Sequence, residues 1–341
     1  MKRGRYVLLL LLIVLFGYYG NDIQISKDVP VKKWDNYQVF FKSMSRRDAQ
    51  MTKLYLKLNY ATTPPLYPGV YRFEKSVSYK EFIEISSTAP KPITAKITLL
   101  EGRSSRDYDA LLAKKWYASG ASYRSYISDK TVIDSLRSKF SFLPAAIPSL
   151  EWYLYPDTYN VDINRPDVVE QLVRLQLQNF ELRIRWPYKS QFMAFDAKLK
   201  GDGFGFKMTP YSVIKLASII ENEEKTQANK AAIAGLFINR IDTNMQLGAD
   251  VTLCYGLGVT YDLCTPSFIV EHLYDKQNPY NTRQQTGLPP TPISNPSLDS
   301  IDAVLNYIKS DYLYYLHDKN GAIHYGSSLQ EHNANKSQYL P

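Results

Sequence analysis

The segment from Tyr211 to Gly256 constrains the fold of this chain more than any other. It begins with a run, Val213 to Ile220, in which most side chains are apolar and no Gly or Pro interrupts. A helix that is apolar on nearly every face must be buried, so the run predicts a central core helix. Three carboxylates follow at its end: Glu221, Glu223 and Glu224.

The position of Glu221 on this helix suggests a chemical role. With 3.6 residues per turn, Glu221 falls angularly between Ile214 and Ala217, whereas Asn222 lies outside that apolar arc. A carboxyl held beside apolar surface resists ionising, and it can then donate a proton near neutral pH. The alternative is that the three glutamates form a solvated helix end facing lysines.

Two further elements complete the segment. Residues 228–241 have an apolar side at helical spacing and predict a second helix. In MQLGADVTLCYG, residues 245–256, the side chains of Val251, Leu253 and Tyr255 alternate, and this pattern predicts a strand.

Upstream of this segment, helices and strands alternate with proline-rich turns. Residues 43–60 repeat apolar side chains at helical spacing, and 62–73 place a short strand after three prolines and a glycine. Ser78 begins a short helix. A similar strand–turn–helix unit follows at 95–117.

The unit at 95–117 can be predicted in more detail. Ile97–Leu100 forms its strand, Glu101-Gly102 its turn and Asp107–Trp116 its helix, with Ser105 as the N-cap. The two units share this architecture, although their residues differ.

A chain of 341 residues is long enough for two domains, and we place the boundary at the proline-punctuated stretch 139–148. SLEWYLYPDTYNV follows at 149–161. Residues 162–195 then predict one helix that ends near Trp186-Pro187, and its leucine-rich face indicates a scaffold role.

Charge and composition narrow the function. The net charge of +8 comes from 41 basic and 33 acidic residues spread along the chain, and no basic run is interleaved with aromatic residues, so we expect no nucleic-acid partner. The excess positive charge fits a protein beside anionic lipid or an anionic polymer. The 28 tyrosines suit contacts with sugar rings or, alternatively, a tyrosine-rich core.

The N-terminus predicts a membrane anchor. Lys2, Arg3 and Arg5 precede the apolar run 6–19, which is shorter than the roughly 20 residues of a standard span. No small-residue cleavage site and no lipid-attachment cysteine follow it. We therefore expect an uncleaved anchor with its N-terminus in the cytoplasm.

The positions of the cysteines and histidines in the sequence do not indicate a metal site. The two cysteines, Cys254 and Cys264, lack a nearby histidine, and the four histidines show no metal-binding spacing. We expect no metal and no cofactor. Outside the cytoplasm a disulfide is allowed, and closing so short a loop contributes roughly 2–3 kcal/mol. The sequence has neither a nucleophile elbow nor a glycine-rich phosphate loop.

Five blocks in fixed order give the most specific signal. They are ASIIENE, AGLFINRI, MQLGADVTLCYG, PYNTRQQTGLPPTPISNP and EHNAN. In this order they resemble the endolytic murein transglycosylase family, also known as the YceG-like family. The resemblance is close over 148–341 and looser from about 30 to 147. SLEWYLYPDTYNV also resembles a family motif, with Trp152 in place of glycine and Tyr155 in place of phenylalanine.

The resemblance implies an α+β fold that is membrane-anchored, with a LysM-like α+β module followed by a mixed α/β catalytic domain. The implied segments are a cytoplasmic tail at 1–5, a transmembrane anchor at 6–20, an N-terminal region at 21–147 with the LysM-like module at about 95–147, and the YceG-like catalytic domain at 148–341. It also implies a single-pass inner-membrane protein whose catalytic domain is periplasmic or otherwise extracytoplasmic. A plain packing module without glycan affinity is the alternative for 95–147.

The resemblance further implies a reaction. Lytic transglycosylases cleave the MurNAc–GlcNAc bond of peptidoglycan with one glutamate, which protonates the leaving oxygen and then accepts a proton from the muramic acid O6 hydroxyl. That hydroxyl attacks the anomeric carbon and leaves a 1,6-anhydro end. The family motif places this acid on Glu221 and makes Glu223 a supporting residue. Nascent glycan is the implied substrate, with membrane lipid and proteins of cell-wall synthesis and elongation as partners.

The remaining substrate-binding candidates are Asn239, Arg240, Asp250, Thr252, Tyr255, Asn281, Thr282, Gly287 and Leu288, together with Glu151 and Asp157. The chain departs from the family pattern at Asn222, Glu224 and Val251, where lysine, threonine and proline are usual. The competing hypothesis is a non-catalytic, membrane-anchored scaffold that binds peptidoglycan. A buried acid at Glu221 argues against a pure scaffold.

Overall fold

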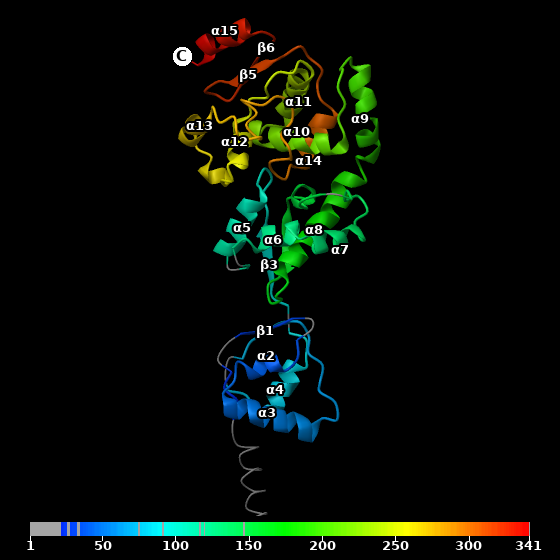
Figure 1. The fold of residues 1–341 in the computed structure, drawn as a ribbon, viewed down its shortest axis with the longest axis vertical. Helices are drawn as coiled ribbons and strands as arrows, with labels where there is room; N and C mark the ends of the chain where they lie inside the picture. Colours follow the sequence, from blue (N-terminus) through cyan, green and yellow to red (C-terminus); the bar gives the residue numbers. More distant parts are fainter. Residues whose placement is uncertain are drawn as a thin grey trace, which may run out of the picture. The chain divides into compact units, whose positions relative to one another are not determined.

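The computed structural model describes residues 22–340, apart from 26, 27, 33, 34, 74, 75, 91, 116, 119 and 146 (Figure 1). The predicted tail at 1–5 and the predicted anchor at 6–20 lie outside the described residues. In the described part of the chain, no helix combines the length and the hydropathy that crossing a bilayer requires.

The chain divides into two compact units, and the division differs from the predicted boundary. Unit 1 comprises Met1–Lys96 with Asn160–Val168, and unit 2 comprises Ile97–Tyr159 with Val169–Pro341. The stretch 139–148 therefore lies inside unit 2. The reason is backbone pairing across it: the Leu150 N–H donates to the Ile127 carbonyl at 2.9 Å.

Unit 1 is a small α+β unit with an aromatic core. Its elements are β1 Val29–Val31, α2 Gln38–Phe41, α3 Arg46–Asn59, β2 Gly69–Tyr71 and α4 Tyr79–Ser86. Strands β1 and β2 pair antiparallel, and the ring of Phe40 lies 5.4 Å from that of Tyr71 and 5.3 Å from that of Phe82. The predicted helix at 43–60 is confirmed as α3, and Ser78 caps α4 with a complete capping box.

Strands β3 Thr94–Thr98 and β4 Thr158–Asp162 form a two-stranded sheet. The helices of unit 2 are α5 Ser105–Lys114, α6 Ser122–Ser128, α7 Lys130–Arg137, α8 Val168–Phe180, α9 Lys189–Gly201, α10 Pro210–Glu223, α11 Gln227–Asp242, α12 Asp250–Gly256, α13 Pro266–His272, α14 Leu298–Leu305 and α15 Leu329–Tyr339. Shorter elements are the 3₁₀ turns Glu151–Tyr153 and Tyr261–Leu263, the π turn Glu181–Arg185 and the hairpin strands β5 Tyr314–His317 and β6 Ile323–Gly326.

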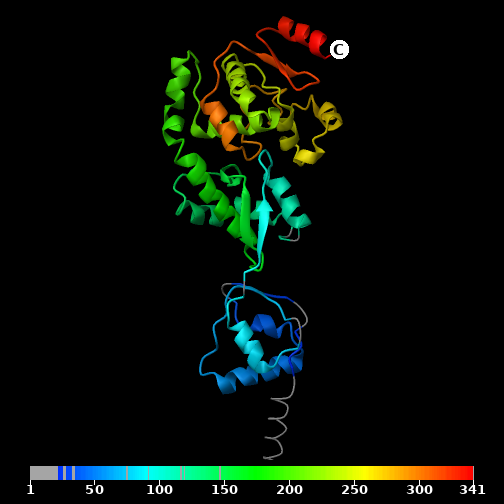
Figure 2. The same ribbon diagram turned by 180° about the vertical axis from the view of Figure 1, so that it is seen from behind.

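Helix α10 is the central element of unit 2, as its sequence predicts. Thr209 caps its first turn, Pro210 occupies its start, and every residue from Leu216 to Ile220 is buried. Helices α11 and α14 pack against it, and Figure 2 shows α14 in orange beside them.

The predicted second helix is confirmed as α11. A side chain at Gly235 on this helix would collide with the Ile308 carbonyl oxygen, which lies 1.9 Å from the position of its first carbon. This close approach of two backbone segments therefore requires glycine.

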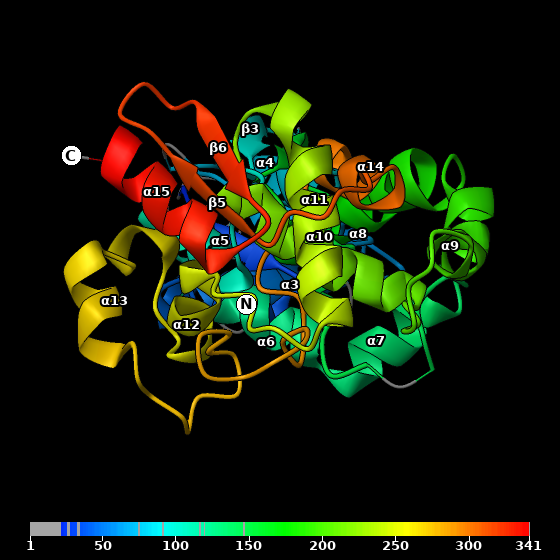
Figure 3. The ribbon, with the colours of Figure 1, turned by 90° about the horizontal axis from the view of Figure 1, so that it is seen from above.

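The C-terminal hairpin covers one side of α11. In Figure 3 strands β5 and β6 lie beside α10 and α11, with α15 along the hairpin's outer side. The ring of Phe237 on α11 lies 6.3 Å from that of Tyr315 on β5, and the Asn335 amide on α15 donates to the Tyr325 carbonyl at 3.0 Å.

Three local predictions were wrong. The alternating residues at 251–255 form helix α12 and not a strand, because alternation over five residues also fits a short helix whose partners cover one side. The cap of α5 is Ser104 and not Ser105, since both its hydroxyl and its N–H bond the Asp107 carboxylate. The single helix predicted over 162–195 begins only at Val168, after β4.

Candidate active site

The three acids at the end of α10 point in different directions. Residues two positions apart on a helix do not face each other, so Glu221 and Glu223 leave different sides of the helix. Glu224 already lies beyond the last helical residue, with extended backbone. Each acid therefore meets different partners.

Glu221 is held on both carboxylate oxygens by donors. Its Oε1 lies 3.3 Å from the Lys230 Nζ, an ion pair in which the two side chains are only 11% and 6% exposed. Its Oε2 accepts from the Ser297 N–H at 2.9 Å, from the Ser297 hydroxyl and from the Ser300 hydroxyl at 2.6 Å. This polar cluster ties α10 to α11 and α14. These donors add polar partners to the buried apolar arc of α10, beside which the sequence places this carboxyl.

A glycine turn lies directly beside Glu221. Gly102 has a φ of +70°, and a side chain there would meet Glu221 Cγ at 3.3 Å and Asn222 Oδ1 at 3.0 Å. Two backbone hydrogen bonds with Asn295 hold the turn. The Gly102 N–H donates to the Asn295 carbonyl at 3.0 Å, and the Asn295 N–H donates to the Arg103 carbonyl at 3.1 Å. The pKa of the neighbouring Glu101 is raised, chiefly by burial and to a smaller extent by the charge of Glu221.

Glu223 has a different environment, because one side-chain donor holds its carboxyl. The Tyr315 hydroxyl donates to its Oε2 at 2.6 Å. Burial raises the pKa of Glu223, and the nearby carboxylate of Asp250 raises it further. The Tyr315 hydrogen bond and the charges of Arg283 and Arg240 act in the opposite direction without cancelling the increase. Of the three acids, Glu223 is the one next to charged residues from several family motifs.

Glu224 anchors the hairpin. Its carboxylate accepts from the Thr226 N–H at 2.6 Å and lies 3.0 Å from His317 Nε2 on β5. The side chain is buried, yet these partners hold the pKa of Glu224 below its ordinary value. Its arrangement indicates a structural role.

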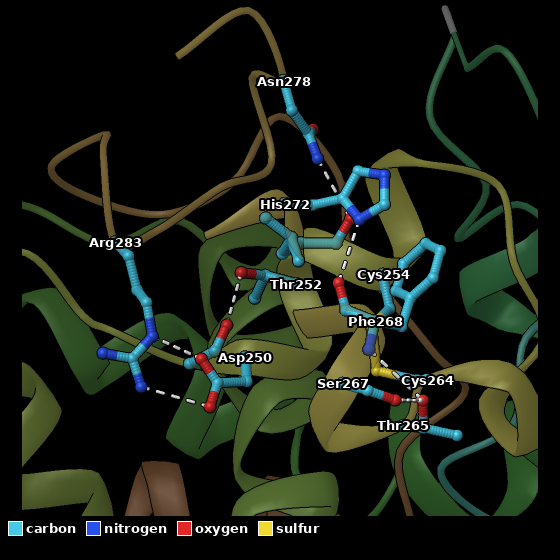
Figure 4. Close-up of a disulfide and its surroundings, with 12 residues drawn as sticks. Asp250, Thr252, Cys254, Cys264, Thr265, Ser267, Phe268, His272, Asn278 and Arg283 are labelled. Carbon is cyan, nitrogen blue, oxygen red and sulfur yellow. Dashed lines mark hydrogen bonds and ion pairs between the residues drawn. A yellow bond between two sulfur atoms is a disulfide. The ribbon is translucent and has the colours of Figure 1, made fainter. Parts of the chain in front are cut away.

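Helix α12 and the loop after α13 build the wall next to Glu223. Asp250 forms a two-point ion pair with Arg283 (Figure 4). The hydroxyls of Thr252 and Thr282 lie 3.0 Å apart. Thr252 and Thr282 are both buried and bind the Ala249 backbone, so they position the wall and do not face solvent.

The predicted neighbourhood of the two cysteines is confirmed. Cys254 on α12 and Cys264 form a disulfide whose Cα atoms lie 5.7 Å apart (Figure 4). The bridge ties α12 to the segment before α13, and Asp262 within that segment pairs with Arg103 at 3.0 Å.

Three other candidates hold loops together. The Asn239 amide donates to the carbonyls of Ser310 and Tyr312, at 2.8 and 2.9 Å. The Arg240 guanidinium donates to the carbonyls before β5 and after α11, and burial lowers its pKa. The Asn281 amide bonds the carbonyls of residues 273 and 275, at 3.1 and 2.9 Å.

Buried Glu151 and half-buried Tyr255 form a second cluster. The Glu151 carboxylate accepts from the Ser105 N–H at 2.6 Å and from the Tyr255 hydroxyl at 3.2 Å. Burial raises the pKa of both groups. Arg106 lies over the Tyr255 ring, 4.9 Å from its centroid, and donates to the Tyr255 carbonyl.

The last candidates are less closely connected to these clusters. Asp157 pairs with Arg183 at 3.2 Å and accepts from the Asn179 amide, so it fastens the start of β4 to the end of α8. Gly287 has a φ of +78° with open space where a side chain would stand, and it and Leu288 are half-buried.

Sequence reasoning missed Lys230, Ser297, Ser300 and Tyr315. Lys230 precedes the apolar positions of α11, and a lone lysine on such a face was the available signal. The serines and Tyr315 lie far along the chain, and no local pattern connects them to α10. Among the described residues, no group of three or more His, Cys, Asp or Glu side chains could hold a metal ion.

Known proteins are similar to this chain in sequence and in fold. The sequence model of the YceG-like family matches residues 31–338. A Bacillus subtilis (strain 168) protein named endolytic murein transglycosylase is 28% identical over 280 residues, which cover 80% of this chain and 72% of that protein. A Streptococcus pneumoniae (strain D39) protein of the same name is 24% identical over 303 residues, and these cover 82% of this chain and 52% of that protein.

The fold also matches a solved structure. A crystal structure of a YceG-like protein from Listeria monocytogenes superposes with a TM-score of 0.57 at 24% identity, covering 90% of this chain and 98% of the other. This likeness supports the mixed α+β architecture. Because the family match extends over most of the sequence, the chain belongs to the YceG-like family.

Proposed function

We propose that this chain is an endolytic lytic transglycosylase of peptidoglycan and that Glu223 donates the proton to the leaving oxygen. The names of the Bacillus and Streptococcus relatives support the activity. The observation that supports Glu223 is its half-buried side chain, whose carboxyl has a raised pKa beside Asp250, Arg240 and Arg283.

A general acid must hold a proton until the leaving oxygen takes it. Catalysis is most efficient when the pKa of the acid lies near the working pH, above that of a free glutamate. Burial and the carboxylate of Asp250 shift the pKa of Glu223 in that direction. The hydroxyl of Tyr315 occupies one carboxyl oxygen, at 2.6 Å, and fixes the orientation of the group.

Glu221 has an environment suited to a structural role. Lys230, the Ser297 backbone and two serine hydroxyls all donate to its carboxylate. We propose that Glu221 is a structural anchor. The assignment of the acid to Glu221 from the family motif stays a prediction, and one experiment tests both residues.

The proposed reaction needs one glutamate in two roles. Protonated Glu223 donates its proton to the glycosidic oxygen as the bond to the anomeric carbon breaks. The resulting carboxylate then takes the proton of the muramic acid O6 hydroxyl, whose oxygen bonds to that carbon and closes the 1,6-anhydro ring. No water enters, and Glu223 ends the cycle protonated, as it began.

The test is digestion of purified sacculi, followed by mass spectrometry of 1,6-anhydro ends. Glu223→Gln is expected to lower their release by about a hundred- to ten-thousand-fold, the usual contribution of general acid catalysis. Glu221→Gln is assayed at a temperature where circular dichroism shows it folded, and it should keep most activity. If Glu221→Gln abolishes release and Glu223→Gln does not, the acid is Glu221. A wild-type protein that binds sacculi without releasing anhydro ends would establish the scaffold alternative.

We also propose an uncleaved anchor at 6–20, a catalytic unit outside the cytoplasm, a LysM-like module at about 95–147 and action on nascent glycan. The Cys254–Cys264 disulfide supports an oxidising compartment, because cytosolic thiols stay reduced. Membrane fractionation with protease access from the outer side tests the topology. A mature N-terminus near Asn21 would contradict the anchor.

A further inference from the structure

We propose that unit 2 carries a second binding site, for a lipid phosphate that has a hydrocarbon chain and an anionic head. The site lies where α8 ends, α9 begins and α10 begins. It does not depend on the chemistry at Glu223.

The site is an apolar cavity of about 450 Å³. This volume lies within the roughly 300–1,000 Å³ of small-molecule sites. Most of its wall is aromatic or aliphatic. The apolar lining residues include Phe142, Phe180, Phe192, Met193, Tyr211 and Ile214. Such a wall fits a hydrocarbon chain better than a sugar, which needs polar partners at its rim.

Two cations and two hydroxyl side chains, Ser141 and Thr209, also belong to the lining. Arg185 and Lys189 line the cavity, and none of its lining residues is acidic. Both cations also lie 5.8 Å from the Trp186 ring centroid. An apolar wall with cations and without carboxylates is complementary to an amphiphile with a negative head. A phosphate is the head that arginine and lysine together recognise best.

The surface beside the cavity has the composition of a membrane contact. Leu182 is 66%, Trp186 59% and Met193 76% exposed, although large apolar side chains are usually covered. Trp and Leu next to Arg and Lys are typical of surfaces that meet the lipid headgroup region. The π turn Glu181–Arg185, which carries Leu182 and Arg185, is itself a rare element, frequent at functional sites.

The cavity is separate from the catalytic acids. Tyr211 and Ile214 lie at the start of α10, whereas Glu223 ends it. The path from Tyr211 to Glu223 rises about 18 Å along the helix axis. A ligand in the cavity therefore occupies a site of its own.

The test uses quenching of Trp186 fluorescence. The full chain, in a fixed concentration of neutral detergent, is titrated with a brominated alkyl phosphate, a brominated alkyl glycoside or inorganic phosphate. We expect saturable quenching by the alkyl phosphate, weaker quenching by the glycoside and none by inorganic phosphate. Trp186→Phe assigns the signal among the four tryptophans of the chain.

Two sets of variants test separately how the site binds the anionic head and how it binds the hydrocarbon chain of the ligand. Arg185→Glu with Lys189→Glu should weaken binding of the alkyl phosphate about tenfold and leave binding of the glycoside unchanged, since the charges of half-buried Arg185 and exposed Lys189 are reversed. Met193→Asp should weaken both amphiphiles. Val270→Asp, at an equally exposed apolar position on α13, is the matched control and should change neither. Equal quenching by both amphiphiles, quenching by inorganic phosphate alone, or no effect of the double charge reversal overturns the proposal.

Discussion

Glu221 and Glu223 leave the same helix two residues apart, yet their surroundings are opposite in kind. Four donors converge on Glu221, from Lys230 on α11 and from the start of α14. One hydroxyl holds Glu223, and another carboxylate, that of Asp250, lies close enough to raise its pKa. The role of an acid therefore depends more on the residues that contact it in the folded chain than on its place in a motif.

The largest expected effect is on stability at the Glu221 cluster. Lys230→Met leaves the Glu221 carboxylate buried without its cation, and breaking one partner of a buried pair costs about 3–5 kcal/mol. Urea unfolding measures the loss. Adding Glu221→Gln to Lys230→Met should recover much of it, because the uncompensated charge is then gone. A loss below about 1 kcal/mol for Lys230→Met, the size of an exposed pair, would remove the structural role that we assign to this pair.

The next effect concerns the wall beside Glu223. Replacing Cys254 and Cys264 together by Ser removes a cross-link over a ten-residue separation, which is expected to cost about 2–3 kcal/mol. Hydrogen exchange should become faster in α12, which carries Asp250, and stay unchanged in α14 at the Glu221 cluster. Equal acceleration of exchange in both helices would mean that the two regions unfold together. The surroundings of Glu221 and Glu223 would then not be independent of each other.

A pH series separates Glu223 from Glu224. The pKa of Glu223 is raised above the ordinary 4.5, so the folded state binds this proton more tightly and loses stability as the pH rises through the raised pKa. The pKa of Glu224 is lowered, so its stabilisation is present above 4.5 and is lost as the pH falls through the lowered pKa.

Thermal unfolding at several pH values measures both slopes. Glu223→Gln should flatten the decline on the alkaline side of 4.5, and Glu224→Gln should flatten the decline on the acid side. Identical curves for the two variants would show that the acids do not differ as described.

The smallest expected effect is a shift in the pH dependence of kcat/KM. Tyr315→Phe removes the hydrogen bond that lowers the pKa of Glu223, so that pKa rises. If Glu223 is the general acid, the alkaline limb of kcat/KM then moves to higher pH. The rate at low pH should change by less than about tenfold, since a hydrogen bond of this type contributes roughly 0.5–1.5 kcal/mol. His317→Ala, which removes a partner of Glu224, is the control and should leave the limb in place.

Local signals predicted the local structure of this chain well. The burial of α10 followed from its composition, and Ser78 marked the start of α4 through a capping box. Helix α12 was predicted as a strand because three alternating apolar residues do not fix a period. Its helical form depends on packing against α10 and on the disulfide from Cys254.

The candidate site was harder to predict than the fold. The family blocks made the acids and Asp250 candidates, but they did not predict the partners that distinguish one acid from another. Lys230 is a single polar residue on an apolar helix, and Tyr315 lies on a hairpin 92 residues after Glu223. Contacts over such separations are set by tertiary packing, which no local period encodes.

The same separations set the order in which the acids acquire their surroundings. Ser297, Tyr315 and His317 follow their glutamates by 76, 92 and 93 positions. During synthesis, α10 is therefore finished long before any of these partners leaves the ribosome. A chain shortened before β5 would contain all three acids but lack two of their three environments. The proton donor that we propose therefore gains its Tyr315 hydrogen bond only after strand β5 has been synthesised.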